Sequence, residues 1–378
     1  MKRVLIGIVL FVVCAYGGVW LAVAGMKQRY VARTWPDNLG TLADVAPRYP
    51  DMETNAAATA LTKLTSNLGV STVPLVKETS PDYDAIKEPL NTYFRAELER
   101  VGDRLQPPPA NVAAYLAQHD APLNAIRDHV VSAGPIRWVQ HFKLGHDAPL
   151  PNLLGQMTLT KLFTARALAK AANHDATAWD DLHTIWLLDR ELWSRPELIS
   201  QLIALAGTRM VNASAAKMPL PVPPWFHEVQ SFDYDHNFAA SYQAEAWMIN
   251  NAPRPPAQRP FFDACALDAV ETMRRWTTDI ATAKGCGISP AQTMDIASWN
   301  VLAQVAVPNL SGAWQRFGRF RAELDATDKI LALRRGETPS TATRCSDGTW
   351  SVSALGLKFS KDIAVPDPGI KYPLVYQR

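Results

Sequence analysis

The feature that most constrains this chain is an uncharged apolar run near its N-terminus. The segment "VLIGIVLFVVCAYGGVWLAVAG", Val4 to Gly25, follows Lys2 and Arg3 and contains no charge in 22 residues. A helix needs about 20 apolar residues to cross a bilayer core, whereas the core of a signal peptide has about 7–15. The run therefore predicts a transmembrane signal anchor over residues 1–26.

Two further signals bear on this anchor. The tripeptide at 22–24, Ala-Val-Ala, fits the small-residue pattern of a cleavage site, so a cleaved and secreted form is the alternative. Basic residues flank the run on both sides, at 2–3 and at 27–33, so the positive-inside rule nearly cancels. Because a short tail precedes one long folded region, we expect residues 4–25 to lie in a bacterial inner membrane. The bulk of the chain is then periplasmic.

The composition is that of a folded protein. Of the 378 residues, 48% are hydrophobic and 20% are charged, and the net charge is +2. A charge this close to neutral gives no electrostatic reason to expect a nucleic-acid partner, and we expect none. Prolines are frequent, 28 in all, but they cluster in breaks between helical segments.

Helical periodicity dominates after residue 50, so we predict a mainly α fold: an irregular antiparallel array of helical hairpins behind the anchor. The predicted parts are an anchor (1–26), a stalk (27–50), a helical domain (51–336) with a possible boundary near 218–226, and a C-terminal extension (337–378). Helices are expected at 52–67, 82–102, 109–118, 120–133, 152–173, 177–193, 197–217, 228–251, 261–283, 290–304 and 310–335. In the extension, "CSDGTWSVSALGLKFS" combines an Asp-Gly turn with alternating residues, which predicts a small β hairpin or mini-sheet.

One part of the chain carries a resemblance. "LTKLFTARALAKAANHDATAWDDLHTIWLLDREL" reads as two helices joined at Asn173-His174-Asp175, similar to a tetratricopeptide hairpin, although no repeat continues on either side. From about residue 110 to 207 the chain resembles a group of uncharacterised bacterial membrane-anchored helical proteins. The resemblance implies architecture only, since that group brings no functional residues with it.

Tryptophan recurs every seven residues in "AWDDLHTIWLLDRELW", at 179, 186 and 193. On a helix these three side chains share one face, while Ile185, Leu188 and Leu192 form a second apolar face. A helix that is apolar on two faces is predicted to lie in the core. We expect the next helix to pack against it through Ile199, Leu202, Ala206 and Met210.

Two polar residues on the tryptophan side, His183 and Arg190, form the candidate binding pair of this helix. If they line an open cavity, the tryptophan stretch is a ligand site. If they are sealed or paired with acids, the stretch is scaffold. An arginine over an aromatic ring is usually a structural contact.

A candidate metal site lies in "SFDYDHNF", where Asp233, Asp235 and His236 offer carboxylate and imidazole ligands. The alternative is that the two aspartates cap and charge the first turn of a helix.

Cysteine usage suggests one disulfide. In an oxidising compartment Cys265, Cys286 and Cys345 can form at most one pair among themselves, and the loop residues Cys286 and Cys345 are the candidates. Cys265 lies in a helical pattern and is expected to be a buried thiol.

The sequence contains none of the compact catalytic motifs searched for, and we expect no cofactor. Two functions remain open. The first is a non-catalytic, membrane-tethered helical domain that binds or supports another component of the cell envelope. The alternative is an envelope hydrolase acting on polysaccharide or peptide, motivated by 12 tryptophans and scattered acids such as Glu245, Asp263 and Glu271.

Overall fold

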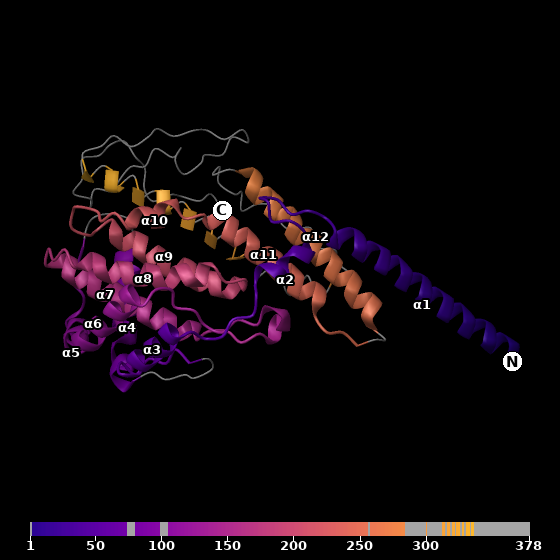
Figure 1. Cartoon of the computed structure of the whole chain (residues 1–378), viewed down its shortest axis with the longest axis horizontal. Helices are drawn as coiled ribbons and strands as arrows, with labels where there is room; N and C mark the ends of the chain where they lie inside the picture. Colours follow the sequence, from indigo (N-terminus) through magenta and orange to yellow (C-terminus); the bar gives the residue numbers. More distant parts are fainter. Residues whose placement is uncertain are drawn as a thin grey trace.

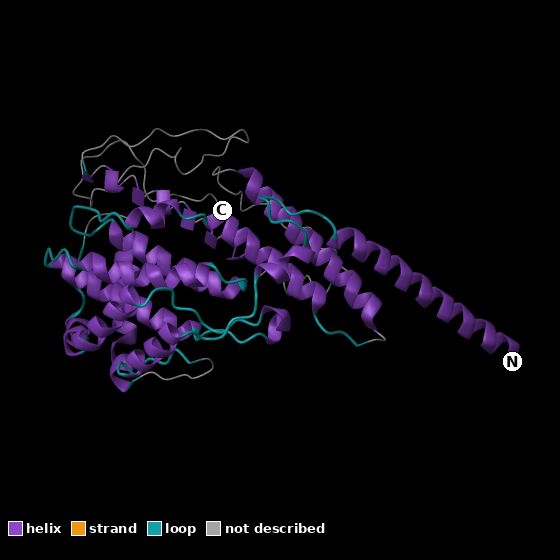
Figure 2. Ribbon diagram, viewed as in Figure 1, coloured by secondary structure: helices purple, strands orange, loops and turns teal. Residues whose placement is uncertain are grey.

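The computed structural model describes residues 2–73, 80–98, 105–255, 258–283, 300 and parts of 312–335 (Figure 1). In these regions the chain is mainly helical, as predicted, and its extended segments form only isolated bridges (Figure 2). The β hairpin predicted within 337–378 lies outside the described residues, as does the helix predicted at 290–304 apart from residue 300.

The helices follow the predicted order closely. Their bounds are α1 (Lys2–Val31), η1 (Leu42–Asp44), α2 (Val45–Arg48), α3 (Ala56–Ser66), α4 (Pro81–Leu98), α5 (Ala110–Gln118), α6 (Asp120–Ser132), η2 (Phe142–Asp147), α7 (Leu153–Ala172), α8 (Ala178–Trp193), α9 (Leu198–Ala215), α10 (Phe226–Ser231), α11 (Tyr234–Asn251) and α12 (Arg259–Ala283). The described residues between 312 and 334 are also helical. One prediction was wrong: the helix expected over 228–251 is two helices, because extended backbone at Phe232 breaks it.

The apolar run forms α1, which projects from the helical body (Figure 1). Residues Leu10–Val31 are long and apolar enough to cross a membrane, and only 6% of that window is buried in the protein. The C-terminal half of α1 packs against α12, and Val23 is buried there. A helix long and apolar enough to span a membrane or act as a signal anchor is therefore joined directly to the folded domain.

The segment predicted as a stalk is part of the folded body, which corrects the linker prediction for 27–50. After α1 the backbone turns sharply, with Asp37 and Asn38 in the left-handed region and a bridge between Trp35 and Gly40. The turn folds the following residues back onto α11, and Leu39 is completely buried. Pro36 and Gly40 thus shape a tight turn instead of a flexible linker.

The helical hairpin predicted from the sequence is present between α7 and α8. His174 adopts φ 57°, the left-handed conformation that commonly ends a helix. Asp175 then accepts a hydrogen bond from the backbone of Thr177 at 2.9 Å, which fixes the start of the next helix. This turn brings α7 and α8 into antiparallel contact, and α9 packs against both.

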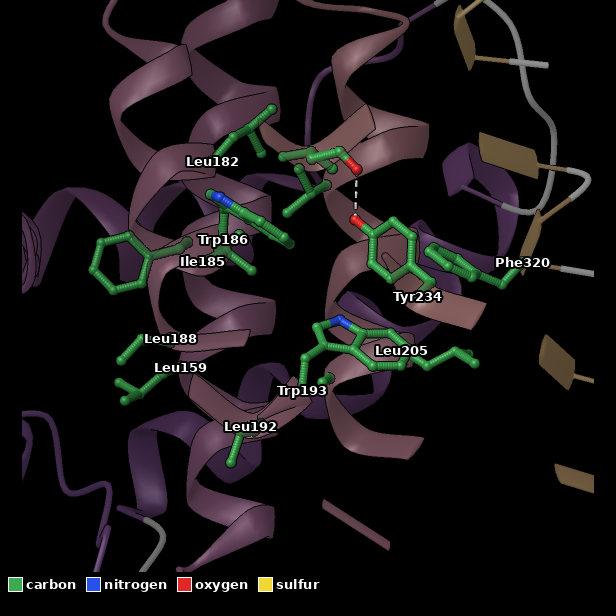
Figure 3. Close-up of a cluster of buried hydrophobic side chains, with 14 of the residues drawn as sticks. Leu159, Leu182, Ile185, Trp186, Leu188, Leu192, Trp193, Leu205, Tyr234 and Phe320 are labelled. Carbon is green, nitrogen blue, oxygen red and sulfur yellow. Dashed lines mark hydrogen bonds between the residues drawn. The ribbon is translucent and has the colours of Figure 1, made fainter. Parts of the chain in front are cut away.

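The three periodic tryptophans lie in the core, as predicted, and Figure 3 shows Trp186 and Trp193 there. Trp186 and Trp193 are fully buried and Trp179 is 4% exposed. Each indole N–H has an acceptor: the carbonyl oxygen of Pro219 for Trp179, a carboxylate for Trp186, and the Thr208 hydroxyl at 3.0 Å for Trp193. Satisfied N–H groups let large aromatic side chains be buried without a polar penalty.

The predicted packing face of α9 was wrong. Ile199 is 46% exposed, whereas the buried face carries smaller and polar residues, among them Gln201, Ala204 and Thr208. Small side chains let α9 approach α8 closely, and Gly207 lies so near that an added Cβ would meet a carboxylate oxygen of Asp189 at 2.3 Å. The apolar pattern therefore predicted the wrong face of α9. The helix packs through the side that carries small residues, because these allow a short distance between α8 and α9.

One hydrophobic cluster runs through the body from Trp35 to Leu331. It contains residues from both sides of the loop at 218–226, so that loop does not separate two cores. The described residues of segment 312–335 join the cluster, with Phe317 and Leu331 fully buried and Leu324 6% exposed.

The burial of Trp193 generates a stability prediction. Replacing Trp193 with Ala removes a fully buried ring and leaves the Thr208 hydroxyl without its donor, so we expect a loss of about 3–5 kcal/mol. Urea unfolding of the full chain in detergent, followed by circular dichroism, measures it. The control is Leu154→Ala at a side chain 72% exposed, for which the expected change is below about 0.5 kcal/mol. Equal effects of the two substitutions would contradict the buried assignment.

Candidate functional site

His183 and Arg190 lie on the same side of α8, facing α10. The His183 ring stacks on Trp225, with ring centroids 4.5 Å apart and an interplanar angle of 18°. Arg190 forms an ion pair with Glu228 at 3.3 Å, and the same carboxylate accepts the N–H of Trp186 at 3.4 Å. The two candidate residues thus help to dock α10 on α8.

The electrostatics of this pair agree with a packing role. Burial lowers the pKa of His183, partly opposed by nearby Glu228 and reinforced by Arg190. The stacked ring is therefore neutral at neutral pH. Arg190 and Glu228 are 37% and 55% exposed, and an exposed ion pair of this kind stabilises a fold by about 0–1 kcal/mol. Pairing with an acid was the outcome expected if this stretch is scaffold. The ion pair of Arg190 with Glu228 therefore indicates a structural role.

The candidate metal ligands have separate partners. Asp233 is the N-cap of α11 and accepts the backbone N–H of His236 at 3.0 Å. Asp235 pairs with Arg321 at 3.3 Å, and the His236 ring contacts Asp37 at 3.0 Å. Among the residues that the structure describes, no group of three or more His, Cys, Asp or Glu side chains is placed to hold a metal ion. The capping alternative accounts for Asp233.

Of the cysteines, Cys265 is buried in α12 with a free thiol, as predicted. Burial raises the pKa of that thiol, so it remains protonated. The candidate pair Cys286 and Cys345 lies outside the described residues, and the disulfide stays a prediction.

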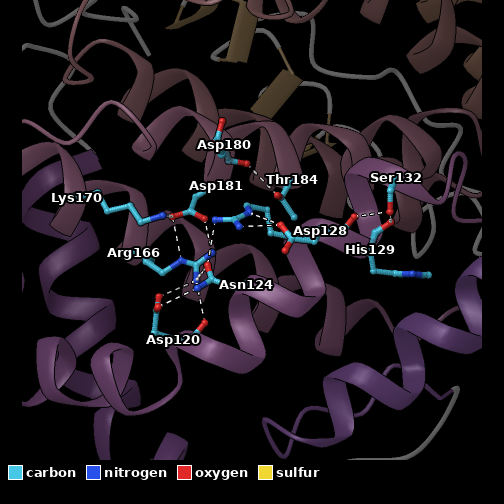
Figure 4. Close-up of polar contacts among 11 residues, drawn as sticks. Asp120, Asn124, Asp128, His129, Ser132, Arg166, Lys170, Asp180, Asp181 and Thr184 are labelled. Carbon is cyan, nitrogen blue, oxygen red and sulfur yellow. Dashed lines mark hydrogen bonds and ion pairs between the residues drawn. The ribbon is translucent and has the colours of Figure 1, made fainter.

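A buried ion network joins α6, α7 and α8 (Figure 4). At its centre is Asp181, completely buried on α8, which accepts two hydrogen bonds from Arg166 at 2.5 and 3.0 Å and pairs with Lys170 at 3.0 Å. Arg166 also reaches Asp120 and Asn124 on α6. A buried carboxylate with two cations is satisfied within the fold, so this network is a cross-link between helices and offers no free reactive group.

Asp189 differs from Asp181 because no cation contacts it in the part of the chain that the structure describes. Its side chain is 2% exposed, lies against Gly207 of α9, and has a hydrogen bond from the Thr208 hydroxyl at 3.4 Å. Burial raises the pKa of Asp189 well above its usual value, only partly offset by that hydrogen bond. The raised pKa favours the protonated form of this carboxyl group, which is enclosed between two helices. At about 100° per residue Asp189 falls between the two apolar faces of α8, so a helical wheel is the sequence signal that could have predicted its burial.

A second polar cluster surrounds the start of α9. Arg195, 4% exposed, pairs with Glu197 at 2.9 Å and donates to the carbonyl oxygens of residues 138 and 139. Glu245 on α11 accepts the backbone N–H of Leu198 at 3.1 Å. Burial raises the pKa of Glu245 to about 7, with a smaller contribution from the charge of Glu197. Neither Glu197 nor Glu245 lines the two clefts that flank α10.

Two adjoining clefts flank α10. The larger has a volume of 720 Å³ and is lined by Leu220, Pro221, Val222, Pro223, Pro224, His227, Gln230, Arg334 and Arg335. The smaller, of 340 Å³, is lined by His227, Gln230, Ser231, Arg321, Leu324, Asp325 and Asp328. His227 and Gln230 belong to both, so the two clefts form one groove, which we call the α10 groove. The sequence analysis noted the proline cluster only as a break between helices.

The comparisons with known proteins add no identity. Protein-family models, curated proteins and solved structures were all searched, and none matches this chain. The resemblance to membrane-anchored helical proteins therefore stays a prediction.

The enclosed carboxyl of Asp189 predicts a pH dependence of stability. Above the pKa of the unfolded chain, about 3.9, the unfolded state ionises while the native carboxyl keeps its proton, so stability falls as pH rises. Asp189→Asn removes this titration and should raise the free energy of unfolding at pH 8 by about 1–3 kcal/mol, with a smaller gain at pH 5. Urea unfolding at the two pH values measures the effect.

The matched control is Asp175→Asn in the exposed α7–α8 turn. A hydrogen bond from the Thr177 backbone lowers the pKa of Asp175, so it is ionised at both pH values and adds no slope between them. A variant Asp189→Asn that is less stable than the parent at pH 8 would contradict a protonated native carboxyl.

Proposed function

We propose that this chain is a non-catalytic, membrane-tethered helical domain that binds another protein of the bacterial cell envelope. The observation that carries the proposal is the α10 groove, because it is a wide surface cleft that the described residues leave open. In this proposal α1 crosses the inner membrane and the helical body lies in the periplasm.

The lining of the groove suits a protein partner. Leu220 is 41% exposed beside Pro221, Pro223 and Pro224, which gives one rigid apolar wall. Rigid apolar surface next to polar residues is typical of protein-binding patches, because little conformational entropy is lost on binding. His227, exposed and shared by both clefts, lies at the centre of this surface.

The position of the groove also suits a tether. α10 lies at the end of the body remote from α1 (Figure 1). A partner bound there meets no obstruction from the membrane, and α1 keeps the domain concentrated at the bilayer surface.

The alternative, an envelope hydrolase, has less support. Glycoside cleavage requires two carboxylates on opposite sides of a cleft. Asp325 and Asp328 line the smaller cleft, but they are three residues apart on one helical segment and so come from the same wall. Glu245, the acid with a pKa near 7, is bonded to the start of α9 away from this groove.

The test is site-specific photocrosslinking in intact cells. A photoreactive residue replaces His227 in the groove, and the matched control carries it at Leu154, which is 72% exposed on α7. We expect one discrete protein adduct from position 227 and none from position 154. A second change, Val222→Arg, should abolish the adduct by placing charge in the apolar wall.

Three outcomes would contradict the proposal. They are equal adduct patterns from positions 227 and 154, adducts at 227 that Val222→Arg leaves unchanged, and no protein adduct at either position.

A further inference from the structure

The register between α1 and α12 is fixed by charges. Lys27 lies 3.8 Å from Asp263, and Arg33 pairs with Glu271 at 2.9 Å. Because the partners advance in the same direction along both helices, α12 runs parallel to the C-terminal half of α1 (Figure 1).

In this register the start of α12 lies beside the uncharged part of α1 and not beside its charged C-terminal end. Asp263 lies one turn inside α12, so the residues before it lie beside the part of α1 that precedes Lys27. A cleft of 280 Å³ marks the contact and is lined by Ala15, Tyr16 and Val19 of α1 together with Gln258, Pro260 and Phe261. These α1 residues belong to the uncharged run.

Helix geometry gives the depth of this contact. The uncharged part of α1, from Val4 to Met26, is about 34 Å long at 1.5 Å per residue, against a bilayer core of about 30 Å. Lys27 therefore lies just outside the core, and Val19 lies about 12 Å below it along the axis. The cleft that contains Phe261 extends into the membrane boundary.

The side chains at this depth match that boundary. Phe261 is 54% exposed, and Trp20 on α1, which lies nearer to Lys27 than Val19 does, is 46% exposed. Aromatic residues gather at the bilayer interface, where their rings lie among the headgroups and upper acyl chains.

Cations surround the same turn. Lys27, Arg254 and Arg259 all contact Asp263, which is one carboxylate for three positive side chains. Arg259 is 54% exposed, so its guanidinium is accessible to lipid phosphates. Basic side chains beside aromatic residues are the pattern of an interfacial membrane contact.

We propose that the first turn of α12, led by Phe261, inserts into the interface of the phospholipid bilayer beside α1. The chain then meets the membrane at two places, the spanning helix and this turn. Two contacts fix the orientation of the helical body, whereas a single helix would leave it free to swing. The inference rests on α1 remaining as an anchor and does not depend on a protein partner.

The test is lipid photocrosslinking with the full chain reconstituted in vesicles of phosphatidylcholine and phosphatidylglycerol. The aromatic photocrosslinker benzoylphenylalanine replaces Phe261, which is a conservative change at a half-exposed position. Parallel samples carry it at Trp20, inside the span, and at Leu154, which is 72% exposed on α7. Mass spectrometry then measures the fraction of chains that carry a lipid adduct.

We expect lipid adducts at positions 20 and 261 and about tenfold fewer at 154, because a side chain inserted at the interface contacts lipid continuously. Adducts at 20 with position 261 no higher than 154 would overturn the inference while leaving the anchor intact. Loss of adducts at both 20 and 261 would show that α1 does not span, which overturns both the inference and the tether. Circular dichroism of each variant confirms that it is folded.

Discussion

The burial of α8 on both of its apolar faces is the constraint on which the helical body depends. Of its side chains Asp180 is exposed and Arg190 is 37% exposed, while the tryptophans pack against α10, α11 and α9 and the opposite face packs against α7. A helix enclosed in this way must satisfy its own polar groups inside the fold. Asp181 does so with two cations, and Asp189 does so by keeping its proton. The neighbouring helices are arranged around these requirements.

This enclosure changes the meaning of the tryptophan period. Twelve tryptophans in one chain raise the expectation of a sugar- or ring-binding surface. In α8, however, each indole N–H is bonded to another part of the protein, and His183 and Arg190 dock α10. The open surface lies on the far side of α10, where the proline-rich loop and His227 form a groove. The surface available for binding is therefore the groove beside α10 and not the tryptophan face of α8.

Much of the fold could be predicted from the sequence where a local pattern determines the outcome. The seven-residue period of tryptophan predicted core burial, and the turn at Asn173-His174-Asp175 predicted the hairpin. The prediction failed where local patterns compete. The stalk was wrong because Asp37 and Asn38 adopt left-handed backbone that turns the chain inward, and α9 packs through Gly207 instead of Ile199.

The candidate site was predictable only as a list of residue types. Pairings such as Arg33 with Glu271, or Trp186 with Glu228, join segments that are distant in sequence, and no spacing rule identifies them. The three candidate metal ligands illustrate the same point. Their spacing suits a metal, yet Asp235 pairs with Arg321 and His236 with Asp37, partners that only the folded chain brings near.

The central claim, that α8 is enclosed scaffold, is tested most directly by native-state hydrogen exchange resolved by helix. If α8 is enclosed on both faces, its amides exchange only through global unfolding, with an opening free energy equal to that of the whole body. Lower protection is expected in α10 and near the α10 groove, at the surface. Exchange of α8 through a local opening, at a free energy well below that of α7 and α9, would contradict the account.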